Sequence, residues 1–371
     1  MSDKNVNSTS SRTKPFSHAN QPLSNIEEKK SYTLKDLAKY TGFSKSTISR
    51  AFTHPEKVKK SSLKKIQTAV DKLGYQPSRV AQRLRSGQGK AKVMGLIIPD
   101  IMNPFFADIT RGIEDFAHTN GYVLILNNSN GDLERQKMCL ETLRMESVDG
   151  VILPPVSESD RYVEGLVNEG FVVVCVDRRL KNVPVDSVVS DNRKGAYIAT
   201  SHMIKLGHKR IAYIGGNSRI STAKERIEGY KEALSDHGID IDNEIILEGD
   251  SRQESGERLT KKLLRHSNPP SALFTGNNMM TLGALAACYR ENIHIPEQLS
   301  LVGYDDVPWA EALNPPATVI DQPGYEIGRL AAETLISRIQ SPNRSPVTIT
   351  LTPKLVIRDS CGASKTLIES I

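Results

Sequence analysis

The chain has 371 residues, of which 38% are hydrophobic and 25% are charged, and its formal net charge at pH 7 is +6. This length exceeds what one ordinary hydrophobic core supports, so we expect two or three domains. The composition excludes a disordered or fibrous protein. No apolar run approaches the roughly 18 residues that a membrane-spanning helix needs.

The cysteines and the first residues of the chain indicate its compartment. The first 25 residues are polar and lack the apolar segment of a signal peptide. The cysteines are scattered without a Cys-x-x-Cys pair, so they predict neither a zinc site nor a disulfide framework. We therefore expect a protein of the reduced cytoplasm without a metal or a cofactor. The four cysteines are Cys139, Cys175, Cys288 and Cys361.

The charges are divided unevenly along the chain. Residues 1–90 carry 19 Lys and Arg against 6 Asp and Glu, whereas residues 91–371 carry 30 against 37. A basic N-terminal part joined to an acidic remainder is typical of a nucleic-acid-binding module fused to a second domain. We expect residues 1–30 to form a disordered tail and the basic module to follow it.

Residues 31–77 have the pattern of a small helical head. Leu34, Leu37 and Ala38 place an apolar stripe on a first short helix. Gly42 permits a tight turn, and a second helix then buries Ile48 and its apolar neighbours. A third helix fits residues 62–73, with Gly74 after its last residue. By itself this pattern also fits an amphipathic hairpin packed on a larger domain, but the basic charge favours a DNA-binding helix-turn-helix.

The exposed face of the second helix suits a DNA major groove. It combines small hydroxyl side chains with a lysine and an arginine, and it has no acidic residue. Such side chains contact phosphates and base edges. We expect Thr33 and Ser44 to act as N-caps of the first two helices. The groove-facing residues are Lys45, Ser46, Thr47, Ser49 and Arg50.

Residues 78–90 read as a hinge. Pro77 can begin a helix and Ser78 can cap it. Val80, Ala81 and Leu84 then form a narrow apolar edge. About two helical turns are too few for a stable isolated helix in water, so we expect a conditional helix that orders when something packs against it. The arginines of this segment are Arg79, Arg83 and Arg85.

Residues 91–371 alternate between apolar strands and amphipathic helices. This alternation predicts parallel sheets covered by helices on both faces. The pattern restarts near residue 210, which predicts two similar halves that face each other across a cleft. The expected strands are residues 93–100, 122–128, 150–155, 171–177, 210–216, 244–249, 271–276 and 299–306. The first three expected helices are residues 105–119, 133–145 and 160–168.

From about residue 33 to residue 358 the chain resembles the lactose-repressor (LacI) family of bacterial transcription regulators. The resemblance rests on TLKDLAKYTGFSKSTISRAF in the head, GYQPSRVAQRL in the hinge, and NPFF, LGHKRIAYIGG, RIEGY, TGNN, LVGYDD and TVIDQP in the remainder. The body also resembles periplasmic pentose and hexose receptors. Asn278 departs from the family, which often has an acid there, and Ser78 stands where an Asn often follows the hinge proline.

The resemblance implies a helix-turn-helix head and a two-lobed effector domain of the periplasmic-binding-protein type, an α/β fold with doubly wound parallel sheets. It also implies a homodimer, or a dimer of dimers, on near-palindromic double-stranded operator DNA. Lys45, Ser46 and Arg50 match base-reading positions, whereas the neighbouring hydroxyls hold phosphates or cap the helix. Leu84 matches a leucine wedged into the minor groove, with small Ala81 beside it. A hinge–hinge dimer contact is the simpler role for Leu84.

The ends of the expected strands provide a candidate effector pocket. Carboxylate, guanidinium and amide groups converging on a cleft suit sugar hydroxyls, which donate and accept hydrogen bonds. Phe105 and Phe106 would pack on the apolar faces of a sugar ring. The set resembles that of ribose receptors, and its arginines also admit a sugar acid or phosphate. The full set is Asn103, Phe105, Phe106, Asp177, Arg178, Arg226, Asn277, Asp305 and Gln322.

Three other functions compete with a sugar-controlled repressor. An enzyme is disfavoured because the chain lacks a nucleophile elbow, a P-loop and a metal-spaced histidine cluster. A secreted sugar receptor conflicts with the DNA-binding head and the polar N terminus. A regulator with a purine or nucleoside effector remains open, as do the direction of the effector's action and the choice between dimer and tetramer.

Overall fold

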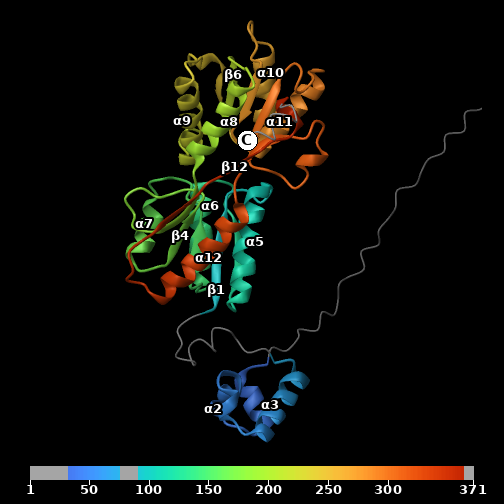
Figure 1. The fold of residues 1–371 in the computed structure, drawn as a ribbon. Coiled ribbons are helices and arrows are strands. Elements are labelled where there is room, and N and C mark those ends of the chain that lie inside the picture. The colour runs from blue at the N-terminus through green and yellow to red at the C-terminus, as the bar shows by residue number, and fades with distance from the viewer. Residues whose placement is uncertain (1–31, 76–90, 363–371) are drawn as a thin grey trace, which may run out of the picture. The chain divides into compact units, whose positions relative to one another are not determined.

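The computed structural model describes residues 32–75 and 91–362, and the chain divides into two compact units, Met1–Gly89 and Lys90–Ile371 (Figure 1). The expected tail at residues 1–30 and the hinge residues Arg79, Ala81 and Leu84 lie outside the described residues. Within the described ranges, no helix has the length and apolarity needed to cross a membrane.

The head is a three-helix unit, as the sequence predicts. Thr33 caps the first helix in a capping box with Asp36, and Ser44 caps the second by accepting from the Thr47 amide at 3.1 Å. Gly42 ends the first helix in the left-handed conformation, with φ +73°. Leu37 and Ile48 are completely buried at the centre. The elements are α1 (Leu34–Thr41), α2 (Lys45–Thr53), the 3-10 turn η1 (Pro55–Lys57) and α3 (Lys60–Leu73), which begins two residues before the predicted helix.

Lobe 1 is a six-stranded parallel sheet in the order β11-β5-β4-β3-β1-β2. Helices α5 and α12 pack on one face and α6 and α7 on the other, so the inner strands β1, β3 and β4 are buried throughout. The strands are β1 (Val93–Ile98), β2 (Val123–Asn128), β3 (Gly150–Leu153), β4 (Val173–Val176), β5 (Asp186–Ser190) and β11 (Thr348–Leu351). The helices are α5 (Pro104–Thr119), α6 (Leu133–Met145), α7 (Arg161–Asn168) and α12 (Gly324–Gln340).

Lobe 2 repeats this order as β12-β10-β9-β8-β6-β7, with only β12 antiparallel among the described strands. Helices α8 and α9 cover one face, and α10 and α11 the other. The strands are β6 (Ile211–Gly215), β7 (Ile246–Glu248), β8 (Ala272–Thr275), β9 (Ser300–Tyr304), β10 (Thr318–Asp321) and β12 (Lys354–Val356). The helices are α8 (Asn192–Lys205), α9 (Ser221–Asp236), α10 (Gln253–Leu264) and α11 (Asn278–Arg290), with 3-10 turns η2 (Asn243–Ile245), η3 (Ala310–Ala312) and η4 (Asp359–Cys361).

The two lobes are not two consecutive halves, which corrects the simple restart predicted from the sequence. The chain crosses between lobes after β5, after β10 and after β11, so α12 and β11 return to lobe 1. Figure 1 shows α12 beside α5, although they are far apart in sequence. Gly112 and Gly328 allow this approach, because an added Cβ on either would lie 2.0 Å from a backbone oxygen of the other helix.

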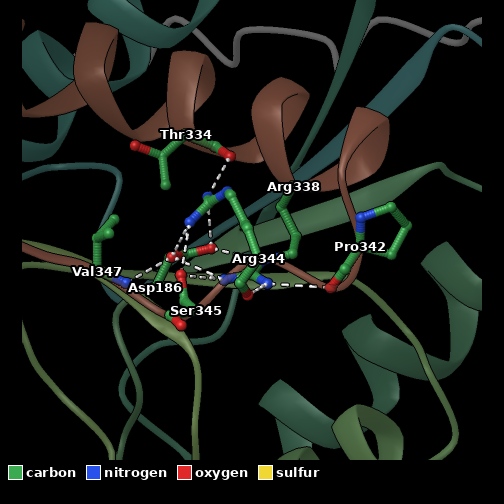
Figure 2. A network of polar contacts seen from close by, with 7 residues as sticks. All are labelled: Asp186, Thr334, Arg338, Pro342, Arg344, Ser345 and Val347. Atoms are coloured by element: carbon green, nitrogen blue, oxygen red, sulfur yellow. Dashed lines mark hydrogen bonds and ion pairs between the residues drawn. The ribbon is translucent and has the colours of Figure 1, made fainter.

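A buried ion-pair network fastens the returning segment to lobe 1 (Figure 2). Asp186, at the start of β5, is completely buried between Arg338 and Arg344. Its carboxylate accepts from both guanidinium groups at 2.8–3.1 Å and from the Val347 amide at 2.9 Å. Bidentate arginine contacts of this kind fix geometry as well as charge. They hold the end of α12 and the approach to β11 against the sheet.

Candidate functional site

The exposed side of α2 presents the residue types expected of a DNA-reading helix. Lys45, Ser46 and Arg50 are exposed, and residues 32–75 hold 10 Lys and Arg against 3 Asp and Glu. The Ser44 hydroxyl lies 2.8 Å from that of Ser46 and 2.9 Å from that of Thr47. These hydroxyls gather at the helix N terminus, where backbone N–H groups favour an anion such as phosphate.

A cavity of about 530 Å³ opens between the lobes of the second unit. It lies beyond the carboxyl ends of the strands, where parallel sheets carry their ligand sites. Eight of the nine residues predicted from the sequence line it. These are Asn103, Phe105, Phe106, Asp177, Arg178, Arg226, Asn277 and Asp305.

The apolar part of the cavity comes from the first turn of α5. Asn103 caps this helix by accepting from the Phe105 amide at 3.0 Å. The rings of Phe105 and Phe106 are both buried, and their centroids lie 5.3 Å apart at 60°. The cap thus fixes two aromatic side chains at the cavity wall, where they can cover the apolar face of a ligand ring.

Asp177 and Asp305 occupy equivalent places in the two lobes. Each follows the third strand in its sheet order, β4 or β9, and each has a left-handed backbone, with φ +64° and +69°. Their amides donate to the next strand, to Val188 O at 3.0 Å and Ile320 O at 2.8 Å. Aspartate tolerates this conformation better than most residues. Burial raises the pKa of both carboxyls, and nearby arginines oppose that rise.

Two arginines, the half-buried Arg178 and the buried Arg226, face these carboxylates. Arg178 Nε lies 3.3 Å from Asp177 Oδ2. Arg226 donates to Asn192 Oδ1 at 2.8 Å and to Gly276 O at 2.5 Å, and its guanidinium carbon lies 3.7 Å from the Tyr304 ring centroid. Burial lowers the pKa of Arg178, whereas Asp305 and other anionic neighbours outweigh burial at Arg226 and raise its pKa. The site therefore holds fixed charges of both signs.

Gln322 and Asn277 have supporting contacts within the chain. Gln322 is not among the residues that line the cavity; its Nε2 donates to Asp305 Oδ1 at 2.6 Å. Asn277 caps α11 by accepting from the Met280 amide at 2.9 Å, and its Nδ2 donates to Ser251 O at 2.9 Å. Both amides thus fix the shape of the lobe 2 wall.

The comparison with known proteins identifies the chain's relatives. Residues 33–78 match the bacterial regulatory proteins of the lacI family, and residues 200–361 match the periplasmic binding protein-like domain. The ribose operon repressor of Haemophilus influenzae is 34% identical over 90% of this chain and 99% of its own. The HTH-type transcriptional repressor PurR of Photobacterium profundum is 32% identical over 88% and 98%.

This chain belongs to the lacI family. A solved structure supports the match: the lac repressor dimer bound to operator and the anti-inducer ONPF has a TM-score of 0.78 at 25% identity, covering 90% of this chain and 100% of that one. The chain is therefore a transcriptional regulator of the repressor type and not an enzyme. The sequence-based assignment of family and fold is confirmed.

The lacI-family chain also has lining residues that sequence reasoning missed. Asp100 and Asp250 follow β1 and β7, as Asp177 and Asp305 follow β4 and β9, so the strand-end rule could have found them. The others lie in loops or at a helix start, where no periodic pattern marks a residue as inward-facing. The further polar lining residues are Asn130, Ser157, Asn217, Arg219, Thr222, Ser251 and Arg252.

Proposed function

We propose that this regulator represses transcription from a near-palindromic operator and that a small sugar, with ribose as the first candidate, binds in the interlobe cavity and controls operator affinity. The single observation that carries the effector proposal is the pairing of buried carboxylates and guanidinium groups beside two buried phenylalanines. Neighbouring sugar hydroxyls need acceptors and donors together, and the ring needs an apolar wall.

The cavity lining supports eight of the nine effector residues proposed from the sequence, all except Gln322. Asn103, Asp177 and Arg178 are presented by lobe 1, and Arg226 and Asp305 by lobe 2. A sugar that touches both groups binds best when the lobes are closed, so it favours the closed state by its differential affinity. We propose induction as the direction, with sugar lowering operator affinity by about 1–3 kcal/mol, the usual size of an allosteric coupling.

Calorimetric titration of the purified full chain tests the effector class. Ribose, other pentoses, hexoses, sugar acids and purines are compared, first alone and then in operator-binding assays. We expect a pentose to bind and to change operator affinity. A purine that changes operator affinity while no sugar does so would overturn the sugar proposal in favour of a purine effector.

For DNA recognition we propose that Lys45, Ser46 and Arg50 read base edges while Thr33, Ser44, Thr47 and Ser49 hold phosphates or cap helices. Arg50→Ala should reduce discrimination at one base pair per half-site by about 1–3 kcal/mol. Lys57→Ala, which removes an exposed charge outside this face, should weaken binding to operator and scrambled DNA alike. An unchanged ratio of operator to scrambled affinity in Arg50→Ala would exclude this assignment.

We propose that residues 78–90 form a hinge in which Leu84 wedges into the minor groove, with Arg79 and Ala81 alongside. Leu84→Ala should keep effector binding but lose operator bending, because the apolar wedge that unstacks a base step is gone. A circular-permutation bending assay measures this. Equal curvature with mutant and wild type would leave Leu84 as a packing residue.

A homodimer completes the proposal, because one head offers too little surface for a palindromic site. Its support is an exposed apolar surface on lobe 1: Ile101, Met102, Val123 and Leu126 are 59%, 73%, 46% and 39% exposed. They lie on or near the edge strand β2, which leaves one side unpaired among the described strands. Sedimentation of Met102→Glu should show weakened association; unchanged dimerisation would place the interface elsewhere.

A further inference from the structure

Asn278, the first residue of α11, makes a hydrogen bond between the lobes. Its side chain is 2% exposed, and its Nδ2 donates to Asn103 Oδ1 at 2.9 Å. Asn103 belongs to lobe 1 and caps α5. One side-chain bond therefore links the starts of two helices that lie in opposite lobes.

The bond fixes the orientation of the Asn103 amide. Its Oδ1 accepts from two N–H donors, the Phe105 amide of its own helix and Asn278 Nδ2. An amide oxygen has two lone pairs, so both are used. Since Asn103 lines the cavity, the group it offers to a ligand is its NH₂ donor and not its carbonyl acceptor.

Asn278 also contacts the lobe 2 side of the site. Its backbone N–H faces the Asp305 carboxylate and helps to lower the pKa of that group. Its own Oδ1 is buried without a hydrogen-bond partner among the described residues. An acceptor left unfilled in this way costs stability unless a water or a ligand hydroxyl completes it. Asn278 thus lies against one proposed effector-binding residue in each lobe, Asn103 in lobe 1 and Asp305 in lobe 2.

We propose that Asn278 is a positioning residue that couples lobe closure to the hydrogen-bonding pattern of the effector site. This inference rests on the proposed effector function of the cavity. In the closed arrangement Asn278 holds Asn103 as a donor, so the chain selects a ligand with an acceptor at that place. An aspartate at position 278 has only acceptors when ionised. It would repel Asn103 Oδ1, or turn the Asn103 amide over and break the α5 cap.

The test measures lobe separation without any effector. Spin labels at Glu134→Cys in α6 and Glu254→Cys in α10, in a Cys139→Ser background, report the interlobe distance in the full chain. Asn278→Asp should shift the population towards larger distances. Asn278→Leu, which removes the donor without adding charge, should also shift it, by a smaller amount. Asn268→Asp, an exposed change in the same lobe, should match the parent.

A second pair of variants separates this role from general damage. Asn103→Asp keeps the acceptor for both donors, so its lobe separation should match the parent while its ribose affinity falls. The effects of Asn278→Leu and Asn103→Ala on lobe separation should not add, because both remove the same bond. The proposal is overturned if both Asn278 variants have the same interlobe distance as the parent. It is also overturned if the effects of Asn278→Leu and Asn103→Ala on that distance add in the double mutant.

Ribose titration of the same variants tests the link to effector binding. We expect roughly fivefold to tenfold weaker ribose binding in Asn278→Leu, the effect of losing one neutral hydrogen bond. Unchanged ribose affinity in an opened variant would refute the coupling. If no sugar binds the parent, the effector proposal fails, whereas the distance measurements still decide whether Asn278 holds the lobes together.

Discussion

The two lobes use the same sheet order, but they contribute differently to the cleft. Asp177 and Asp305 have equivalent strand-end positions and the same left-handed backbone. Asp177 forms an ion pair with Arg178, its neighbour in sequence. Asp305 instead accepts a hydrogen bond from the side-chain amide of Gln322, which follows the next strand, β10. Lobe 1 also supplies the aromatic wall. The backbone is therefore the same at the strand ends of both lobes, but the side chains around it differ. This difference makes the cleft asymmetric, so that it can orient a ligand.

The lobes also differ in how their last segments are attached. In lobe 1, Asp186 is completely buried between two arginines. In lobe 2, the corresponding tie is a single pair, Arg358 to Asp306 at 2.6 Å, with side chains 14% and 23% exposed. Removing one partner of a buried pair leaves an uncompensated charge, whereas a more exposed pair is partly screened by solvent. The two ties should therefore differ in their contribution to stability.

The largest predicted effect is at Asp186. Asp186→Ala should lower the free energy of unfolding by about 3–5 kcal/mol, because two half-buried arginines lose their completely buried partner. Asp306→Ala should cost only about 1 kcal/mol. Urea unfolding of both variants at pH 7 measures the difference. Equal losses would show that burial does not distinguish the two ties.

The pKa of Asp186 gives this prediction a pH dependence. Burial tends to raise this pKa, but hydrogen bonds from Arg338, Val347 and Arg344 outweigh burial and hold it below its usual range. The unfolded state then binds a proton at a higher pH than the folded state does. The stabilisation from Asp186 is present at neutral pH and is lost as the pH falls through the folded pKa. The difference in free energy of unfolding between wild type and Asp186→Ala should therefore become smaller at acidic pH.

The next largest effect concerns the effector. Asp305→Ala and Asp177→Ala should each weaken sugar binding by about 2–3 kcal/mol, because a hydrogen bond to a charged group is lost. Arg226→Ala should likewise abolish the sugar response, and all three should bind operator without sugar nearly as wild type does. Calorimetry and operator titration check both parts. If only the lobe 1 variant or only the lobe 2 variants lost sugar affinity, a single lobe would hold the ligand.

Much of this architecture could be predicted from local patterns. The caps Thr33 and Ser44, the turn at Gly42 and the apolar strands are short-range signals, and all of them appear in the structure. The strand-end rule accounts for lining residues such as Asp177 and Asp305 because parallel strands bring their carboxyl ends together, whereas Arg226 lies within α9. The rule also placed Gln322 in the cavity wall, whereas that side chain reaches the cavity only through Asp305.

What the sequence could not show depends on contacts between distant segments. The return of α12 and β11 to lobe 1 is specified by Asp186, Arg338 and Arg344, which are up to 158 residues apart. No local pattern marks such a pair. The bond from Asn278 to Asn103 spans 175 residues and was equally hidden. The sequence marked Asn278 only as a departure from the family, without the reason that the interlobe contact provides.

The smallest predicted effect lies where the lobes join. Asp321 ends β10, just before a crossover, and its pKa is raised to about 6 by burial and by the nearby carboxylates of Asp306, Asp305 and Asp108. The folded state therefore binds a proton more readily than the unfolded state, opposite to Asp186. Stability should fall as the pH rises from about 4 to about 6.

Asp321→Asn removes this penalty while keeping the size of the side chain. At pH 7.5 the variant should be more stable than wild type by about 1 kcal/mol, because solvent at this half-exposed site screens part of the repulsion. At pH 4 the two proteins should unfold at the same urea concentration, since Asp321 is then largely protonated in the folded state. A variant that is less stable than wild type at pH 7.5 would mean that ionised Asp321 is stabilised by a cation, with Arg358 as the first to examine.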